Sequence, residues 1–426
     1  MLNLQVNVDK IPIKVFKYMI VKEIRSLFPA LSRKVYGKDL VYFDNAATSQ
    51  RVAGALDEWN RISSESNANI HRAVHRLADE ATQAYEQARD AVKDFINART
   101  REEVIFTSGT TAAINLAAFC FGEAYVSEGD EVIVTEAEHH SNIVPWQMMC
   151  LRKKAILKVL PIDDSGHLML EKLDDLLTER SRIMAVTHIS NVLGLINPIK
   201  EIVDICHRRG VKVLVDGAQG AVHCKLDVQE LDCDFYAFSG HKLYAATGTG
   251  VLYGKKELLD EMPPYMGGGE MVGTVKFSGT TFAPLPMKYE AGTQNFASVP
   301  TLKSAIEFIN LLNDSELIKY NEGVRDYLLE KLSSDERITL YGVPRGTSEE
   351  KIPLFSFCVK GVHHEDLALI LDKMGIALRS GQMCAEPVMD RFGVTGMLRV
   401  SLAPYNTMEE AEYFIECLNR AIEMLM

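Results

Sequence analysis

Short apolar runs alternate with amphipathic stretches through residues 41–254. The runs are rich in β-branched side chains, and the stretches between them have helical spacing, which is the order expected of a mostly parallel sheet covered by helices on both faces. In residues 81–96, for example, apolar side chains recur at steps of three and four and predict a helix with one buried stripe. The predicted strands are residues 41–44, 104–107, 132–135, 156–161, 183–187, 211–215, 235–238 and 250–253. The pattern therefore predicts an α/β fold built around one large sheet.

The pattern changes after residue 305. Predicted helices become longer there, and glycines punctuate residues 359–400, so we predict a large domain of residues 31–305 and a smaller α+β domain of residues 306–426. Thr407 and Glu410 form a capping-box pattern that marks the start of a final amphipathic helix.

Two further segments have their own patterns. Residues 1–30 show helical spacing up to Pro29, and we expect them to pack on the small domain as an N-terminal segment. Residues 263–273 read PPYMGGGEMVG, and their glycines and prolines predict a mobile loop.

Charge and cysteine content narrow the class of protein. The chain has 46 Lys and Arg against 58 Asp and Glu, and this net charge of −12 argues against nucleic acid as a partner.

No apolar run approaches the ~20 residues that a membrane helix needs, so we expect neither a membrane span nor a signal peptide. The eight cysteines are dispersed without a C-x-x-C pair, which is typical of a protein of the reducing cytoplasm. Adjacent histidines such as His139 and His140 diverge on strands and helices, so we predict no metal site.

Polar side chains collect directly after the predicted strands. Ligands of doubly wound sheets bind beyond the carboxyl ends of the strands, and five chain segments place polar groups there: Thr110, Thr111, His139, His140, Asn191, Asp216, Gln219, Ser239, His241 and Lys242. Each residue alone has an ordinary structural alternative, since Thr110 can cap a helix, Asp216 can cap a turn and Lys242 can be a surface lysine. A hydroxyl, an imidazole, an amide, a carboxylate and an amine on one rim together favour a binding site.

One end of this rim has the features of a phosphate site. Residues 108–111 read SGTT and place a glycine turn before a predicted helix, whose first N–H groups and positive dipole end attract an anion. Ser239 and His241 can donate hydrogen bonds to the same anion from across the rim.

A phosphate beside the amine of Lys242 suggests pyridoxal phosphate. This cofactor needs an amine for its imine, a carboxylate that keeps its ring nitrogen protonated, and a flat group that stacks on the ring. Lys242, Asp216 and His139 meet these needs in that order. A free lysine has a pKa of about 10.4 and is almost wholly protonated at neutral pH, so we expect burial and neighbouring cations to lower the pKa of Lys242.

The residues of this rim lie within, or alternate along the chain with, nine short sequence motifs. They read FDNAATSQ at 43–50, IHRAVH at 70–75, SGTT, EHHSNIVPW at 138–146, THISNVLG at 187–194, VDGAQ, FSGHK, EAGTQN at 290–295 and RSGQMCAEP at 379–387. With them the chain resembles the fold-type I pyridoxal-phosphate enzymes of aminotransferase class V, and most closely the SufS-type, group II cysteine desulfurases, from about Leu31 to the C-terminus. The resemblance implies the fold-type I transferase architecture and conversion of L-cysteine to L-alanine.

The resemblance also implies a role for each residue of the site. Lys242 would bind the cofactor covalently, Asp216 would pair with its ring nitrogen, and His139 would stack on the ring. The remaining cofactor contacts would come from Thr110, Thr111, Gln219, Ser239 and His241, with Thr293 added from the second subunit of a homodimer. The substrate would contact Asn191, Arg379, Arg399 and His71.

Cys384 is the expected nucleophile and lies in a short stretch that we expect to be flexible. By the resemblance, Lys242 moves the α-proton, Cys384 attacks the substrate sulfur and is left as a persulfide, and the sulfur goes to iron–sulfur cluster assembly. Only fourteen residues separate Cys384 from Arg399, as in the SufS group, which implies a SufE- or SufU-like sulfur acceptor protein. The alternatives are a selenocysteine lyase acting on L-selenocysteine, another class V enzyme and, from a different class, a cofactor-free scaffold partner.

Overall fold

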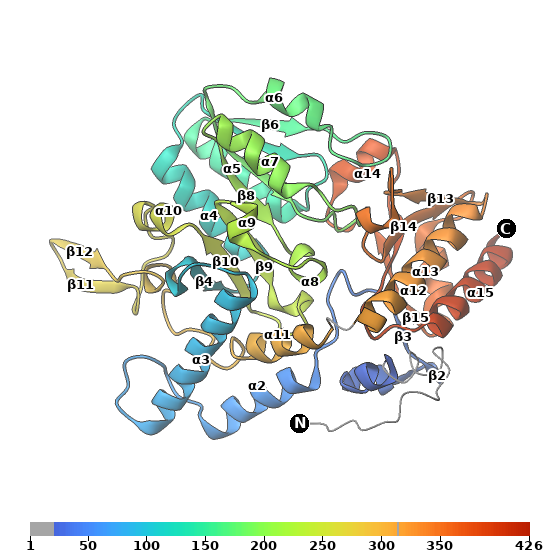
Figure 1. The fold of residues 1–426 in the computed structure, drawn as a ribbon, viewed down its shortest axis with the longest axis horizontal. Coiled ribbons are helices and arrows are strands. Elements are labelled where there is room, and N and C mark those ends of the chain that lie inside the picture. The colour runs from blue at the N-terminus through green and yellow to red at the C-terminus, as the bar shows by residue number, and fades with distance from the viewer. Residues whose placement is uncertain (1–20, 313–314) are drawn as a thin grey trace.

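The computed structural model describes residues 21–312 and 315–426. A seven-stranded sheet lies at the centre of the large domain (Figure 1). Its strands in spatial order are β4 (Val104–Thr107), β10 (Gly250–Gly254), β9 (Phe235–Ser239), β8 (Lys212–Asp216), β7 (Ser181–Thr187), β5 (Glu131–Thr135) and β6 (Ile156–Leu160). Strand β10 is antiparallel to both of its neighbours, and the other pairs are parallel. Seven of the eight predicted strands form this sheet, with ends within two residues of the prediction.

The eighth predicted strand, residues 41–44, belongs elsewhere. The structure forms only the two-residue strand β3 (Val41–Tyr42) there, which pairs with β15 (Ile376–Ala377). Val41 and Phe43 are buried in the core of the small domain, so this apolar run serves a different core from the one predicted.

Helices cover both faces of the large sheet because its strands bury alternate residues on opposite sides. Val213 and Val215 of β8 pack with α3 (Arg76–Phe95) and α7 (Ile199–Arg208). Leu214 points to the other face, against α4 (Thr110–Tyr125) and α5 (Val144–Lys153). The remaining helices of this domain are α2 (Ala53–Glu65), α6 (Leu173–Leu176), α8 (Gly220–His223), α9 (Val228–Leu231), α10 (Lys256–Glu261) and α11 (Thr301–Leu311). The short hairpin of β1 (Lys34–Val35) and β2 (Lys38–Asp39) lies beside the small domain (Figure 1), where the Tyr36 hydroxyl accepts from Lys373 Nζ at 2.8 Å.

A hairpin of β11 (Val272–Lys276) and β12 (Gly279–Phe282) projects from the large domain at the left of Figure 1. The loop predicted for residues 263–273 therefore ends where this hairpin begins. The sequence pattern does not predict this hairpin, because its residues are almost all exposed and neither face carries an apolar pattern.

The small domain contains a four-stranded antiparallel sheet with the order β13 (Ile338–Tyr341), β14 (Leu354–Val359), β17 (Met397–Ser401) and β16 (Arg379–Gly381). Its helices are α12 (Ser315–Ser334), α13 (His364–Lys373), α14 (Glu386–Phe392) and α15 (Met408–Leu425). The capping box predicted at the start of α15 is confirmed, since the Glu410 N–H donates to Thr407 Oγ1 at 3.2 Å and the Thr407 N–H donates to Glu410 Oε2 at 3.0 Å.

Two domain boundaries differ in detail from the prediction. The predicted division after residue 305 falls inside α11, which packs along α2 and α3 and so lies wholly on the large domain. The N-terminal segment contacts both domains, because the Phe28 ring meets Phe308 of the large domain at 5.1 Å and Tyr405 of the small domain at 4.5 Å. Residues 1–20 of that predicted segment lie outside the described residues. No helix in the described part of the chain combines the length and hydrophobicity needed to cross a membrane.

Candidate active site

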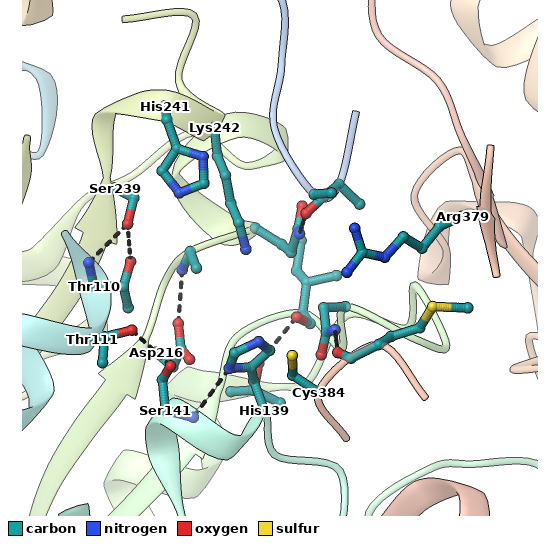
Figure 2. Close-up of a pocket in the computed structure, with 18 of the residues that line it drawn as sticks. Thr110, Thr111, His139, Ser141, Asp216, Ser239, His241, Lys242, Arg379 and Cys384 are labelled. Carbon is teal, nitrogen blue, oxygen red and sulfur yellow. Dashed lines mark hydrogen bonds between the residues drawn. The ribbon is translucent and has the colours of Figure 1, made fainter. Parts of the chain in front are cut away.

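A cavity of about 260 Å³ opens at the carboxyl ends of the parallel strands, between the two domains. Figure 2 shows how side chains from separate segments converge on it. It is lined by twelve of the fourteen predicted site residues, namely Thr110, Thr111, His139, Asn191, Asp216, Gln219, Ser239, His241, Lys242, Arg379, Cys384 and Arg399. The rule that ligands bind at these strand ends therefore located the pocket.

Hydroxyl groups and helix N–H groups gather at one end of the pocket (Figure 2). Helix α4 begins at Thr110, whose backbone N–H and hydroxyl both lie 2.7 Å from Ser239 Oγ. Gly109 precedes it with φ +148°, and a Cβ on the neighbouring Gly250 would lie only 2.4 Å from Gly109 Cα. The two glycines therefore let β10 pass directly behind the turn, and the N–H groups of Thr111 and Ala112 in the first turn of α4 have no partner among the described residues and can face an anion.

Ser141 also belongs to this end of the pocket, although the sequence analysis did not name it. Its hydroxyl lies 2.7 Å from Thr111 Oγ1, and its backbone N–H donates to His139 Nδ1 at 3.0 Å. Ser141 follows His139 by two residues in the motif EHHSNIVPW, so the motif itself contained the signal.

The amine and the carboxylate required for the cofactor lie at the ends of neighbouring strands. Lys242 follows β9 and Asp216 ends β8. Burial lowers the pKa of Lys242 to about 8. Burial also raises the pKa of Asp216, while the Ala218 N–H, which donates to Oδ1 at 2.9 Å, and the charge of Lys242 oppose that rise.

The same two groups show that the pocket fits pyridoxal phosphate. Among the described residues no group accepts a hydrogen bond from Lys242 Nζ, and none donates to Asp216 Oδ2, although Asp216 is only 4% exposed. Buried polar groups are ordinarily paired. An imine at the amine and a protonated ring nitrogen at the free carboxylate oxygen would satisfy both.

The His139 imidazole is held as a neutral ring. Burial, followed by the charge of Lys242, lowers its pKa to about 4. Because Nδ1 accepts the hydrogen bond from Ser141, the proton of the neutral ring is assigned to Nε2. A neutral, oriented ring suits stacking on a flat cofactor better than an imidazolium does.

The small domain contributes Arg399 from β17. Its Nη1 donates to the Asn191 carbonyl at 2.9 Å and its Nη2 to Asp44 Oδ1 at 3.0 Å, while its buried Nε has no partner among the described residues. Burial lowers the pKa of Arg399, and the charge of Asp44 opposes that effect. Arg379 Nη1 lies 4.0 Å from the other oxygen of Asp44. The sequence analysis did not name Asp44, although this residue ends the predicted strand 41–44 and so met the strand-end rule.

Cys384 is exposed at the rim of the pocket, but its backbone is held. Its carbonyl accepts from the His140 N–H at 2.8 Å, and the Met383 carbonyl accepts from Asn191 Nδ2 at 2.8 Å. The Glu386 N–H donates to His140 Nε2 at 3.1 Å. Met383 and Cys384 both have left-handed backbone angles, φ +54° and +55°, which cost roughly 1 kcal/mol or more each outside glycine. The stretch expected to be flexible is therefore tied to the large domain at three points.

Two predicted residues lie outside the pocket of this chain. His71 Nε2 is 3.2 Å from Glu86 Oε1, near the start of α3. Thr293 is exposed and lines a separate cavity of about 330 Å³ together with Ser108 and Gly248. Their roles toward substrate and cofactor stay predictions. Among the described residues no group of three or more His, Cys, Asp or Glu side chains is arranged so that it could hold a metal ion.

Comparisons with known proteins agree on one family. The pattern of the aminotransferase class-V family matches residues 41–414. A cysteine desulfurase of Cronobacter sakazakii is 44% identical over 405 residues, which cover 95% of this chain and 98% of the relative. The crystal structure of the cysteine desulfurase CsdA from Escherichia coli has a TM-score of 0.87 and 39% identity, covering 95% of this chain and 99% of that one. A cysteine desulfurase from Thermococcus onnurineus NA1 has the same TM-score with 34% identity, covering 93% of this chain and 99% of that one.

Proposed function

The chain belongs to the class V aminotransferase family, and within it to the pyridoxal-phosphate-dependent cysteine desulfurases, and from this premise we propose that its pocket converts L-cysteine to L-alanine and leaves the sulfur on Cys384. The observation that carries the proposal is the position of one exposed thiol. Cys384 lines the same cavity as the half-buried amine of Lys242 and the guanidinium of Arg399. A cysteine there can meet the sulfur of a bound amino acid.

The residues of the pocket divide among the parts of the cofactor. Lys242 would hold it covalently, Asp216 would face its ring nitrogen, and His139 would cover its ring. The phosphate would lie at the start of α4, with hydrogen bonds from Thr110, Thr111, Ser239 and His241. When bound, the cofactor draws electrons away from the α-carbon of the substrate.

Lys242 acts as the base in this scheme. Burial lowers its pKa to about 8, so about a tenth of the amine is uncharged at pH 7, far more than for a free lysine, and can accept the α-proton of the substrate. The substrate carboxylate is held by the guanidinium of Arg399 and by the side chain of Asn191, both of which line the pocket. With its carboxylate fixed there, the side chain of the substrate extends toward the rim where Cys384 lies.

The sulfur transfer forms one bond and breaks another. The Cys384 thiolate attacks the substrate sulfur, an S–S bond forms, and the C–S bond breaks with its electron pair moving to carbon. The carbon then takes up a proton, alanine leaves, and Cys384 retains the transferred sulfur as a persulfide. Arg399 and Asn191 keep the amino acid oriented throughout, while His139 keeps its neutral ring in the pocket wall.

The test is the substitution Cys384→Ser. Alanine release from L-cysteine in the presence of a reductant is expected to fall to background, while the visible absorption of the bound cofactor is unchanged because the cofactor contacts are intact. Cys358→Ser is the matched control, since Cys358 is half-buried and its Sγ lies 3.5 Å from the Gly396 carbonyl, outside the pocket lining. Retained alanine release in Cys384→Ser would overturn the proposal.

The finer parts of the function belong to the same proposal. The chain acts as a homodimer in which Thr293 of each subunit completes the phosphate site of the other. The persulfide sulfur passes to a SufE- or SufU-like acceptor protein and enters iron–sulfur cluster assembly in the cytoplasm. The resemblance of the motifs and the short segment after Cys384 support these steps.

A further inference from the structure

One lysine amine is buried between the two domains, outside the pocket. Lys351 is 1% exposed and lies between the turn at Ser348–Glu350 and strand β14. Its Nζ donates a hydrogen bond to the Leu193 carbonyl, and among the described residues no carboxylate pairs with it. Burying an unpaired ammonium is costly, and burial accordingly lowers the pKa of Lys351 to about 7. An apolar side chain would fill this space without that cost. What the amine adds is its hydrogen bond to the Leu193 carbonyl.

The Leu193 carbonyl is the last of three consecutive carbonyl groups that face the small domain. Each of the three accepts a hydrogen bond from a small-domain side chain. The pairs are Asn191 with Arg399 Nη1 at 2.9 Å, Val192 with Ser356 Oγ at 2.5 Å and Leu193 with Lys351 Nζ. We call residues 191–193 the carbonyl strip. The small domain therefore holds this part of the large domain at three successive points.

The backbone after the strip fits the small domain closely as well. Gly194 has φ +69°, and a Cβ there would lie 3.0 Å from the Leu354 carbonyl. The Gly194 carbonyl accepts from the Ile352 N–H at 2.9 Å. The contact region is thus packed tightly, so a shift at one end of the strip moves the other end with it.

The other end of the strip is part of the substrate site. The Asn191 side chain lines the pocket and its carbonyl is bound to Arg399, so the strip fixes the position of the Asn191 amide relative to the guanidinium. In the proposed function these two groups hold the carboxylate of the amino-acid substrate.

We propose that Lys351 is a positioning residue for substrate binding, which holds the carbonyl strip so that the Asn191 amide and the Arg399 guanidinium stay at the separation that a carboxylate requires. The inference rests on the proposed function. The carboxylate keeps its charge and place throughout the reaction, so its contacts contribute equally to the bound substrate and to the transition state. Loss of such uniform binding raises KM and leaves kcat unchanged.

The test is Lys351→Met in the full, cofactor-loaded protein, because methionine keeps the apolar stem and removes the donor. We expect KM for L-cysteine to rise about fivefold, within the range of one hydrogen bond, with kcat within about twofold of the unmodified value. The dissociation constant of L-alanine, followed through the visible absorption of the cofactor, should rise in parallel. The matched control is Lys360→Met. Exposed Lys360 also donates to a backbone carbonyl of the small domain, that of Glu336 at 2.7 Å, but it follows the C-terminal end of β14, whereas Lys351 precedes the N-terminal end.

Several outcomes overturn the inference. It is wrong if Lys351→Met lowers thermal stability but leaves KM and the L-alanine dissociation constant unchanged well below the unfolding temperature, or if kcat falls while KM does not change. If Lys351→Met does not fold, Ser356→Ala removes the middle donor with a smaller change and must give the same rise in KM. An unmodified protein that releases no alanine from L-cysteine contradicts the proposed function instead, and L-alanine binding by the two variants still tests Lys351.

Discussion

Replacing Glu290 by glutamine is expected to lower the unfolding temperature by about 3 °C. The Glu290 carboxylate accepts four hydrogen bonds in the interior, two of them from Arg89 at 2.7 and 3.0 Å, one from the Tyr85 hydroxyl at 3.0 Å and one from the Phe106 N–H at 2.8 Å. The Arg89 side chain is 0% exposed and that of Glu290 is 2% exposed. Glu290→Gln leaves this guanidinium buried with half of its counter-charge.

The magnitude follows from the burial. Removing one partner of a buried ion pair costs about 3–5 kcal/mol, and the lower end applies here because Arg89 keeps Glu86, whose Oε2 lies 3.1 Å from Nε. A chain of 426 residues unfolds with an entropy of about 0.9 kcal/mol per kelvin, at roughly 2 cal/mol/K per residue. A loss of about 3 kcal/mol therefore corresponds to about 3 °C.

Calorimetric or circular-dichroism melts of the cofactor-loaded protein, at one scan rate, would measure the shift. Glu58→Gln is the control, because it makes the same chemical change in an exposed pair, Arg61 Nη2 to Glu58 Oε1 at 2.8 Å, and should shift the melt by less than about 1 °C. Equal shifts in the two variants would refute the reasoning that burial sets the cost.

Two further predictions concern the cofactor end of the pocket. Gly250→Ala should weaken cofactor retention at least about tenfold, measured by absorption after dialysis, because the new Cβ would displace the Gly109 turn. Gly267→Ala is the control, since no atom lies within 4 Å of its Cβ. Equal cofactor retention in the two variants would contradict the prediction. The rate of cofactor loading onto the apoprotein, followed by stopped-flow absorbance, should rise with pH and level off above about pH 8. The pKa of Lys242 is lowered to about 8, and the amine reacts in its uncharged form, which predominates above that pKa. A loading rate that does not change between about pH 6 and about pH 9.5 would show that this amine does not control loading.

The large sheet could be predicted because its strands, apart from the partly exposed edge strand β6, are buried on both faces and read as apolar runs. Residues 41–44 show the limit of that pattern. They have the same composition as a central strand, but the core that receives Val41 and Phe43 is formed by helices more than 280 positions later in the chain, and local sequence does not encode that choice. The hairpin β11–β12 was missed for the opposite reason, because an exposed strand has no buried face to set its pattern.

The large-domain side of the pocket could be predicted because Thr110, Thr111, His139, Asn191, Asp216, Gln219, Ser239, His241 and Lys242 all end or follow strands of one sheet. The substrate side was reached only through the family motifs, since Arg379, Cys384 and Arg399 come from the other domain. The partners of these residues could not be found from either source. Asp44 meets Arg399 across 355 positions, and Lys351 stands in the unremarkable sequence KIPLF, where nothing local indicates a buried amine.

The three hydrogen bonds around Cys384 bear on how sulfur leaves the protein. A cysteine on a long mobile loop could move outward to an acceptor. Here the main chain is hydrogen-bonded to the large domain on both sides of Cys384. The Cys384 sulfur can therefore move by side-chain rotation alone, which displaces it by about a few ångströms. In the proposed sulfur transfer, an acceptor protein would therefore have to bring its own sulfur atom to the rim of the pocket, on an element narrow enough to reach Cys384.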